Sequence, residues 1–170
     1  MNYDYTIFVH SRASDCRKEG AYAFVSDHKD SEEIIKGKIE GPSLTSIRAH
    51  LICVICALKS TPGNQEKILL ISNLEAFVSP FHSADLTRRL RKGILPNSDL
   101  WAKIFDLTRT RRIDVRSVSI KSSPPEQLLT ASKASLRALR EENVKPDVID
   151  EIMEYPDLFS TRLFNDYEKE

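Results

Sequence analysis

The sequence predicts an α/β domain in which helices pack on a mixed five-stranded sheet. Three runs rich in β-branched and aromatic residues follow one another early in the chain with short links, which is typical of an antiparallel meander. Beyond residue 42, helical patterns alternate with apolar runs, which is typical of parallel pairing. The 170 residues suffice for one such domain and leave little room for a second.

The meander is expected at residues 5–9, 21–26 and 33–39. The first two runs are continuous stretches of apolar and aromatic residues, as in buried strands. A charged link that contains a glycine, residues 11–20, separates them. The third run is shorter and more polar, so we expect it to be more exposed.

A helix and a central strand are expected next. Ser43 or Thr45 can cap a helix whose apolar residues recur at helical spacing until the break at residues 61–63. Residues 67–72 form a continuous apolar run bounded by turn residues. Such a run predicts a strand that is covered on both faces.

The second half of the chain is expected to be mainly helical. Helices are predicted at residues 74–78, 85–91, 99–108 and from 126 to about 142, with a strand at 113–120. Pro80 is expected to stop the first of these helices, and Pro124-Pro125 precedes the last. The strand alternates apolar and polar residues, so we expect it to be half-buried.

The C-terminal segment differs from the rest in charge. We divide the chain into a domain at residues 1–142 and an acidic helical extension at 143–170, with short helices at 147–155 and 157–167. Residues 141–170 carry ten acidic and three basic side chains, a net charge of −7. Their apolar content is too high for a purely disordered acidic arm. We expect the extension to fold on the domain, dock on a partner chain or cover the basic segment.

The sequence also predicts a compartment. Residues 1–5 lack the basic start of a signal peptide, and no apolar run approaches the roughly 18 residues of a membrane span. Cys53 and Cys56 lie inside an apolar helical pattern, and the total of three cysteines is odd. We therefore expect no disulfide framework, a reducing cytoplasm and no membrane partner.

The net charge of zero conceals a basic segment. Residues 84–121 carry ten basic and four acidic side chains, a net charge of +6. Clustered arginine and lysine suit phosphate groups, and arginine adds paired donors. The residues predicted to contact nucleic acid are Arg88, Arg89, Arg91, Lys92, Arg109, Arg111 and Arg112. A solvated helix face, or a docking surface for an acidic protein, is the alternative.

Four local sequences carry a resemblance to a known family. They are Ile7-Phe8-Val9-His10-Ser11-Arg12, residues 48–58, residues 68–73 and Asn97-Ser98-Asp99-Leu100-Trp101, which is close to N-x-D-L-W. In order and spacing the chain resembles ribonuclease H type 1 over roughly residues 5–140. The resemblance implies a ribonuclease H-like sheet with helices on both faces. It also implies cleavage of the RNA strand of RNA–DNA hybrids by two divalent metals that four carboxylates hold.

The departures from the family fall on those carboxylates. The matching positions carry His10, His50, Asn73 and Ser132. Neutral imidazole, amide and hydroxyl groups lack the negative charge that offsets the dehydration of Mg²⁺. We therefore expect no catalytic residue, no resident metal and no cofactor.

An active enzyme is the alternative. It would be a divergent ribonuclease that uses Mg²⁺ or Mn²⁺ and cleaves the RNA strand of hybrids. Its metal site would have to be rebuilt from other carboxylates, namely Asp15, Glu19, Glu75 and Asp99. Sequence spacing alone does not bring these four residues together.

Two further arrangements of side chains offer other chemistry. A zinc site could be formed by His50, Cys53 and Cys56, with His10 beside them. Residues spaced three apart, however, wind around the helix and do not point to one common position. Core packing is therefore the simpler role for both cysteines. A histidine with Ser11 or Ser72 offers a nucleophile and base. Because no orienting carboxylate is evident, we expect these residues to fill the vacated metal pocket with mutual hydrogen bonds.

The predicted function is binding. We expect a catalytically degenerate ribonuclease H-like protein that binds nucleic acid, either an RNA–DNA hybrid or a structured nucleic acid, or else a protein partner. The basic region at residues 82–121, and the C-terminal extension for a protein partner, are the expected contact surfaces.

Overall fold

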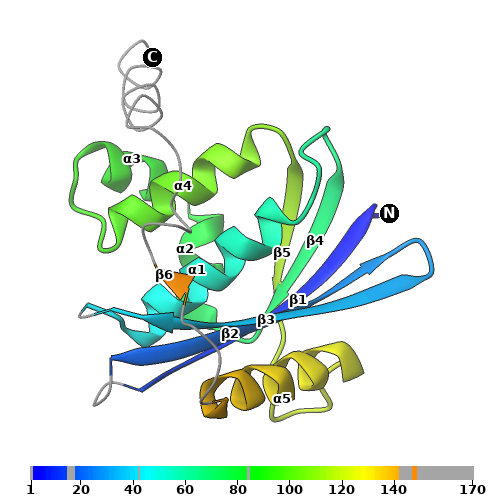
Figure 1. The fold of residues 1–170 in the computed structure, drawn as a ribbon. Helices are drawn as coiled ribbons and strands as arrows, with labels where there is room; N and C mark the ends of the chain where they lie inside the picture. The colour runs from blue at the N-terminus through cyan, green and yellow to red at the C-terminus, as the bar shows by residue number, and fades with distance from the viewer. Residues whose placement is uncertain (1, 15–17, 42, 84, 142–146, 149–170) are drawn as a thin grey trace.

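The computed structural model describes residues 2–14, 18–41, 43–83, 85–141 and 147–148. Its centre is a single sheet with the strand order β5-β4-β1-β2-β3-β6 (Figure 1). The strands are β1 Tyr5–Ser14, β2 Glu19–His28, β3 Ser31–Glu40, β4 Lys67–Ser72, β5 Arg112–Ser117 and β6 Asp147–Val148. The five predicted strands are present, and the mixed sheet is confirmed.

The first three strands form the predicted meander. β1 pairs with β2 and β2 with β3, both antiparallel. β1 is longer than expected, because its backbone pairing with β2 continues through the polar residues up to Ser14 opposite Glu19. The link predicted at residues 11–20 is therefore mostly strand. Backbone hydrogen bonds, which polar residues make as well as apolar ones, set this length.

The parallel half of the sheet consists of β1, β4 and β5. β4 lies between the other two and is buried except at its first residue. β5 ends at Ser117, short of the predicted residue 120, because its partner β4 ends opposite at Ser72. The last contact with β4 is the hydrogen bond from the backbone N–H of Val118 to the carbonyl of Ser72, at 2.9 Å.

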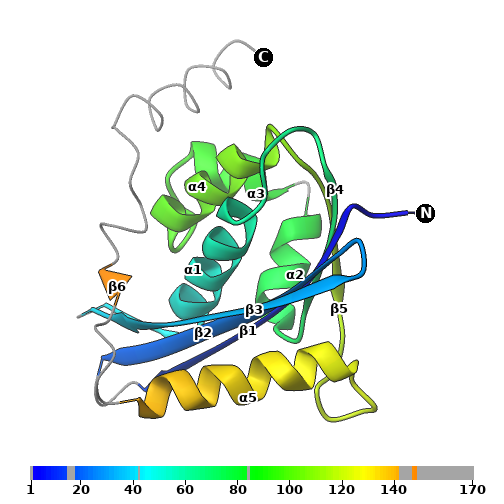
Figure 2. The same cartoon turned by 45° about the vertical axis from the view of Figure 1, so that its right-hand side comes forward.

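Helices cover both faces of the sheet, as predicted. They are α1 Ser46–Lys59, α2 Glu75–His82, α3 Asp85–Arg91, α4 Ser98–Thr108 and α5 Glu126–Arg140. α5 lies alone along one face, and α1 to α4 gather on the other (Figures 1 and 2). The larger apolar core lies under α1 to α4 and a smaller one under α5.

The alternation of side chains along β1 assigns its residues to these two layers. Ile7 and Val9 belong to the core beneath α1, while Phe8 belongs to the core beneath α5. Successive side chains of a strand point to opposite faces. Ser11 therefore continues on the α1 side, and His10 and Arg12 lie on the α5 side.

The helix boundaries follow local chemistry. Thr45 caps α1, and its Oγ1 accepts a hydrogen bond from the backbone N–H of Arg48 at 3.2 Å. Pro80 lies inside α2 instead of ending it. A proline removes one backbone hydrogen bond, and in this short helix the chain continues for two residues beyond it.

The C-terminal extension is a further place where the sequence prediction and the structure differ. Asp147 and Val148 were expected to begin a helix, but they pair in parallel with Ile39 and Glu40 of β3 as β6. The other residues predicted to form the two short helices lie outside the described residues. The division at residue 142 and the role of the extension remain predictions. Within the described ranges, no helix is long and apolar enough to cross a membrane.

Candidate functional site

The predicted site lies where β1, α1 and β4 meet, and its centre is a chain of three hydrogen-bonded side chains. Nδ1 of His50 lies 2.9 Å from Oγ of Ser11, and Nε2 of the same ring lies 2.8 Å from Oγ of Ser72. Ser72 Oγ also accepts the backbone N–H of Leu74 at 3.0 Å, at the start of α2. Both ring nitrogens of His50 are thus used within the protein.

Burial keeps His50 neutral. Its exposed fraction is 1%, and its ring lies 5.4 Å from that of Phe77. Desolvation, and to a smaller extent the charge that His10 would carry, lower the pKa of His50 from 6.5 to about 3. A base this weak takes no proton from a serine at neutral pH, so the contact of Ser11 with His50 is a structural hydrogen bond.

A second network lies on the opposite face of β1. Nδ1 of His10 is 3.0 Å from Oγ of Ser135 on α5, and Arg12 donates to the same oxygen at 3.2 Å. Ser135 gives its own proton to the carbonyl of Ser132 at 2.8 Å. Ser135 Oγ is therefore the acceptor, and His10 donates through Nδ1. Burial, and then the positive charge of Arg12, lower the pKa of His10 from 6.5 to about 4.

Three of the four predicted positions therefore divide between these two networks. His50 is joined to Ser11 and Ser72, while His10 and Ser132 belong to the α5 network, in which Arg12 bonds Oγ of Ser132 at 2.9 Å. Asn73 is half-buried immediately after β4. Sequence reasoning missed Arg12 and Ser135. Their signal was the spacing, since residues 10 and 12 share a strand face and residues 132 and 135 share a helix face.

These residues do not fit a pair of divalent metals. The hydrogen-bonded groups are neutral imidazoles and hydroxyls and one guanidinium, and none of them supplies the anionic oxygen that Mg²⁺ requires. Among the described residues, no three His, Cys, Asp or Glu side chains gather as metal ligands. His10, His50, Cys53 and Cys56 are among the described residues, as are Glu19, Glu75 and Asp99. Asp15 lies outside the described residues.

Two residues of those arrangements have structural partners instead. The Cys53 thiol donates to the carbonyls of His10 at 3.6 Å and Ala23 at 3.5 Å, and burial raises its pKa. Asp99 forms a two-pronged ion pair with Arg48, with N–O distances of 3.0 and 2.9 Å. This pair ties α1 to the start of α4.

The first predicted basic cluster lies on α3 and just after it. Arg88, Arg91 and Lys92 are exposed, and Arg89 is half-buried. Arg88 pairs with Asp85 one turn earlier on the same helix. Cations in the last turn of a helix also stabilise its dipole. We call Arg88, Arg89, Arg91 and Lys92 the α3 basic cluster.

The second predicted cluster lies at the opposite end of α4. Arg109 and Arg112 are exposed there. Arg111 is buried, with an exposed fraction of 9%, and its guanidinium donates to both oxygens of Thr61, to the carbonyl of Leu107 and to Oγ1 of Thr110. Four of the five N–H donors of Arg111 are thus used within the fold, and its burial sets it apart from exposed Arg109 and Arg112 as a contact for a nucleic-acid backbone.

The aromatic residues near the α3 basic cluster are mostly core residues. Phe77 and Trp101 are 0% and 3% exposed, and their rings stack with centroids 5.7 Å apart. Neither ring offers a free face on which a base could stack. A contact of this region with nucleic acid would therefore be electrostatic.

Comparison with known proteins gives likenesses of structure only. No family model matches the chain, and no curated protein sequence does. The solved structures similar to it include LC9-RNase H1, described as a type 1 RNase H with the type 2 active-site motif. The TM-score is 0.60 at 13% identity, over 79% of this chain and 71% of the other.

Two foamy virus structures are also similar. The foamy viral protease–reverse transcriptase in complex with dsDNA matches with a TM-score of 0.63 at 15% identity, over 81% of this chain and 95% of the other. The native prototype foamy virus protease–reverse transcriptase matches with 0.62 at 14% identity, over 83% of this chain and 21% of the other. Likeness at this level of identity establishes architecture and not activity. The chain has a ribonuclease H-like fold.

Proposed function

We propose that this chain is a nucleic-acid-binding module that has kept the ribonuclease H-like fold and lost its hydrolytic chemistry. One observation carries the proposal. The helix position that matches a family carboxylate is a fully buried, neutral His50, and serine hydroxyls occupy both of its ring nitrogens.

The hydrogen bonds of His50 support the loss of metal chemistry. To admit a metal ion, at least one of these bonds would have to break, and a buried hydroxyl would lose its partner at a cost of about 1–3 kcal/mol. The neutral ligand set would return no charge compensation for that cost. A stable, filled pocket is the arrangement that these residues favour.

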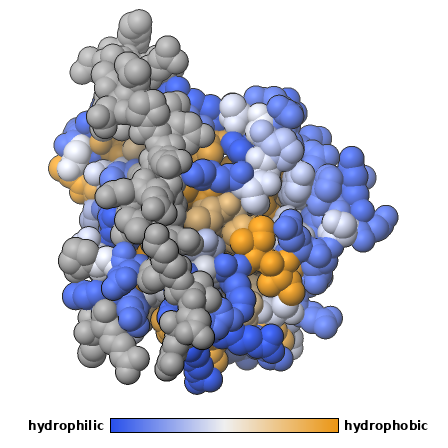
Figure 3. Space-filling view, in the orientation of Figure 1, coloured by the Kyte–Doolittle hydropathy of each residue, from blue (hydrophilic) through white to orange (hydrophobic). Residues whose placement is uncertain are grey.

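The exposure of the α3 basic cluster supports the binding role. Three of its four cations are exposed on one short helix and the residue after it. On the face drawn in Figure 3, hydrophilic residues predominate on the right, while hydrophobic residues gather in the centre and at the upper left. The support for a charged partner is therefore the exposed cations themselves. The dsDNA complex of the similar foamy viral protein adds support from a related fold.

Binding is tested with a matched pair of triple variants. The first is R88A/R91A/K92A, which leaves half-buried Arg89 in place. The control is K133A/R137A/R140A, three exposed cations on α5 that lie on the opposite face of the sheet. Affinity for an RNA–DNA hybrid, duplex DNA and duplex RNA is measured by fluorescence anisotropy between 50 and 200 mM salt.

The α3 variant should bind at least about tenfold more weakly and lower the slope of log K against log salt by roughly 2 to 3. The control should retain the wild-type slope. Equal losses in the two variants would mean that only net charge matters, and unchanged binding in both would refute the role of the α3 basic cluster. Failure of every nucleic acid to bind would favour the alternative, an acidic protein partner.

A reducing compartment such as the cytoplasm is part of the proposal. Its support is that neither Cys53, which is buried, nor Cys56 forms a disulfide within the described part of the chain. The second candidate function, a divergent metal-dependent ribonuclease, is tested by the cleavage assay that closes the Discussion.

A further inference from the structure

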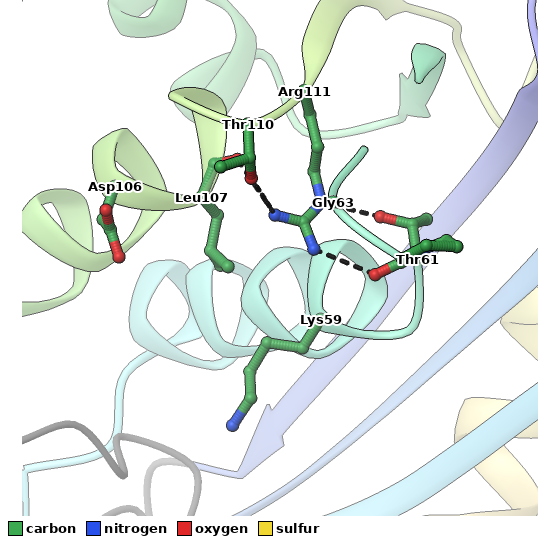
Figure 4. A pocket seen from close by; sticks show the side chains of 8 residues that line it. Lys59, Thr61, Gly63, Asp106, Leu107, Thr110 and Arg111 are labelled. Atoms are coloured by element: carbon green, nitrogen blue, oxygen red, sulfur yellow. Dashed lines mark hydrogen bonds between the residues drawn. The ribbon is translucent and has the colours of Figure 1, made fainter. Parts of the chain in front are cut away.

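A cavity of about 460 Å³ lies between the end of α1 and the end of α4. It is separate from the site above, because it adjoins the first residues of β4 and β5, whereas His50 and Ser72 lie at the other end of β4. Its walls are Lys59, Thr61, Pro62, Gly63, Asp106, Leu107, Thr110 and Arg111 (Figure 4). The volume is within the range of sites for small molecules.

Arg111 brings an incompletely compensated charge to this cavity. Its guanidinium lies between Thr61 and Thr110, with distances of 2.6 Å to Thr61 Oγ1 and 2.9 Å to Thr110 Oγ1 (Figure 4). Its four partners are hydroxyls and carbonyls, and no carboxylate within the described part of the chain forms an ion pair with it. A charge buried to this extent is ordinarily matched by an opposite one.

The surrounding charges leave the cavity positive. Lys59 extends from the end of α1, and among the described residues Asp106 is the one acidic residue in the cavity wall (Figure 4). Burial, and then the charge of Lys59, lower the pKa of nearby Lys103 to about 8, so this lysine is mostly protonated at pH 7. Lys59, Lys103 and Arg111 against Asp106 give a formal charge of +2.

The rim of the cavity is built close to the guanidinium. Gly63 has a φ of +81°, and a Cβ there would lie 3.2 Å from Nη2 of Arg111 and 3.2 Å from Oγ1 of Thr110. The backbone N–H of Gln65 donates to the carbonyl of Thr110 at 2.7 Å, which holds the two walls together. A glycine in this conformation permits the loop to approach Arg111 closely.

We infer that this cavity is a binding site for a small phosphate monoester, such as a sugar phosphate or a nucleotide. The phosphate group lies beside Lys59 and Arg111, where Thr110 supplies a hydroxyl, whereas the hydroxyl of Thr61 donates to the carbonyl of Leu58. A dianion matches the +2 of the site better than the single charge of a phosphodiester does. Asp106 opposes the phosphate and is available to a hydroxyl of the rest of the ligand.

The test is calorimetric titration of the full chain with ribose 5-phosphate, with ribose as the uncharged control. Lys59→Ala should weaken binding of ribose 5-phosphate by about tenfold, since it removes one charge-assisted contact. Asp106→Asn should tighten binding about threefold, because it removes the opposing charge. Lys133→Ala, an equal charge change on α5, should leave the affinity unchanged.

The choice of variants distinguishes the loss of a ligand contact from misfolding of the protein. Lys59 is exposed at a helix end, and a gain of affinity in Asp106→Asn does not arise from damage. Absence of ribose 5-phosphate binding at millimolar concentration, or equal affinities in all variants, would overturn the proposal. Equally tight, Lys59-dependent binding of an oligonucleotide that lacks terminal phosphates would also overturn it and assign the cavity to nucleic-acid backbone. None of these residues is in the α3 basic cluster, so this test and the test of nucleic-acid binding fail independently.

Discussion

Nε2 of His50 and Oγ of Ser72 lie 2.8 Å apart in the buried space between α1 and the end of β4. Each residue is almost completely buried, with exposed fractions of 1% and 0%. Because neither can turn to water, the two side chains depend on each other for hydrogen bonding. This mutual dependence makes the filled pocket measurable as a contribution to stability.

A double-mutant cycle measures that contribution. His50→Leu leaves Ser11 and Ser72 without their partner, and Ser72→Ala leaves Nε2 of His50 and the N–H of Leu74 without theirs. Each change should lower the free energy of unfolding by about 2 kcal/mol in urea titrations. The double variant should lose about 1 kcal/mol less than the sum. Strictly additive losses would show that the two groups are not coupled.

Stability should fall as the pH is lowered from 7 to 5. The pKa values of His10 and His50 in the folded protein, about 4 and about 3, lie below the ordinary 6.5. Between those values the unfolded chain binds more protons than the folded one, so the stabilisation is complete above pH 6.5 and is lost below it. The slope is up to about 1.4 kcal/mol per pH unit for each histidine.

Urea unfolding at half-unit steps from pH 7 to 5 checks this dependence. His50→Leu should have a shallower slope than the wild type, because one of the two buried groups is gone. A wild-type stability that stays flat or rises over this interval would mean that the histidines are protonated in the folded protein.

Arg12 is predicted to hold α5 against the sheet. It donates to Oγ of Ser135, and to Oγ and the carbonyl of Ser132. Arg12→Gln should cost about 1–2 kcal/mol and should speed hydrogen exchange in α5 more than in α1. Because the charge of Arg12 lowers the pKa of His10, the same change should raise that pKa in an NMR titration.

Arg12→Lys is the matched control, because it keeps the charge and removes the planar fork of donors. It should leave the pKa of His10 near the wild-type value and lose an intermediate amount of stability. If both variants raised the pKa of His10 equally, hydrogen bonding through Ser135 and not charge would be the cause.

The ion pair of Arg48 and Asp99 should make a modest contribution. Hydrogen bonds from Arg48 are the main cause of the lowered pKa of Asp99. The Asp99 side chain is 53% exposed, and solvent screens the pair, so Asp99→Asn should cost only about 0.5–1 kcal/mol. The contribution is present above the ordinary pKa of the carboxyl group and is lost as the pH falls through the lowered one. A loss above 2 kcal/mol would show a larger structural role.

The periodicity of hydropathy predicted those helices and strands whose first and last residues are determined by the neighbouring sequence. The strand at residues 67–72 and the helix at 85–91 are found at the predicted positions, because breaks in hydropathy pattern mark both ends of each. The limits of β1 and β5 were not predictable in this way. β1 ends at the pair of Ser14 and Glu19, where β2 begins, and β5 ends at the pair of Ser117 and Ser72, where β4 ends. Strand pairing, and not the hydropathy of the residues themselves, sets both limits.

The types of residue at the site could be predicted from the sequence, but their hydrogen-bond partners could not. The resemblance to ribonuclease H placed His10 and His50 in one region, but the sheet face that each side chain occupies decides which serine it contacts. Arg111 shows the same limit. Its burial depends on Thr61, which lies 50 residues away, and no local pattern separates it from exposed Arg112. The chemistry of a residue is visible in the sequence, whereas its surroundings depend on tertiary contacts.

Hydrolysis of a labelled RNA–DNA hybrid tests the central claim most directly. The purified full chain is incubated with the hybrid in Mg²⁺ or in Mn²⁺, beside His50→Leu and Asp99→Asn, and the RNA strand is followed on a denaturing gel. The account predicts that, in Mg²⁺ and in Mn²⁺, the RNA strand is cleaved no faster than in the control without protein. Metal-dependent cleavage by the wild type that disappears in His50→Leu would contradict it.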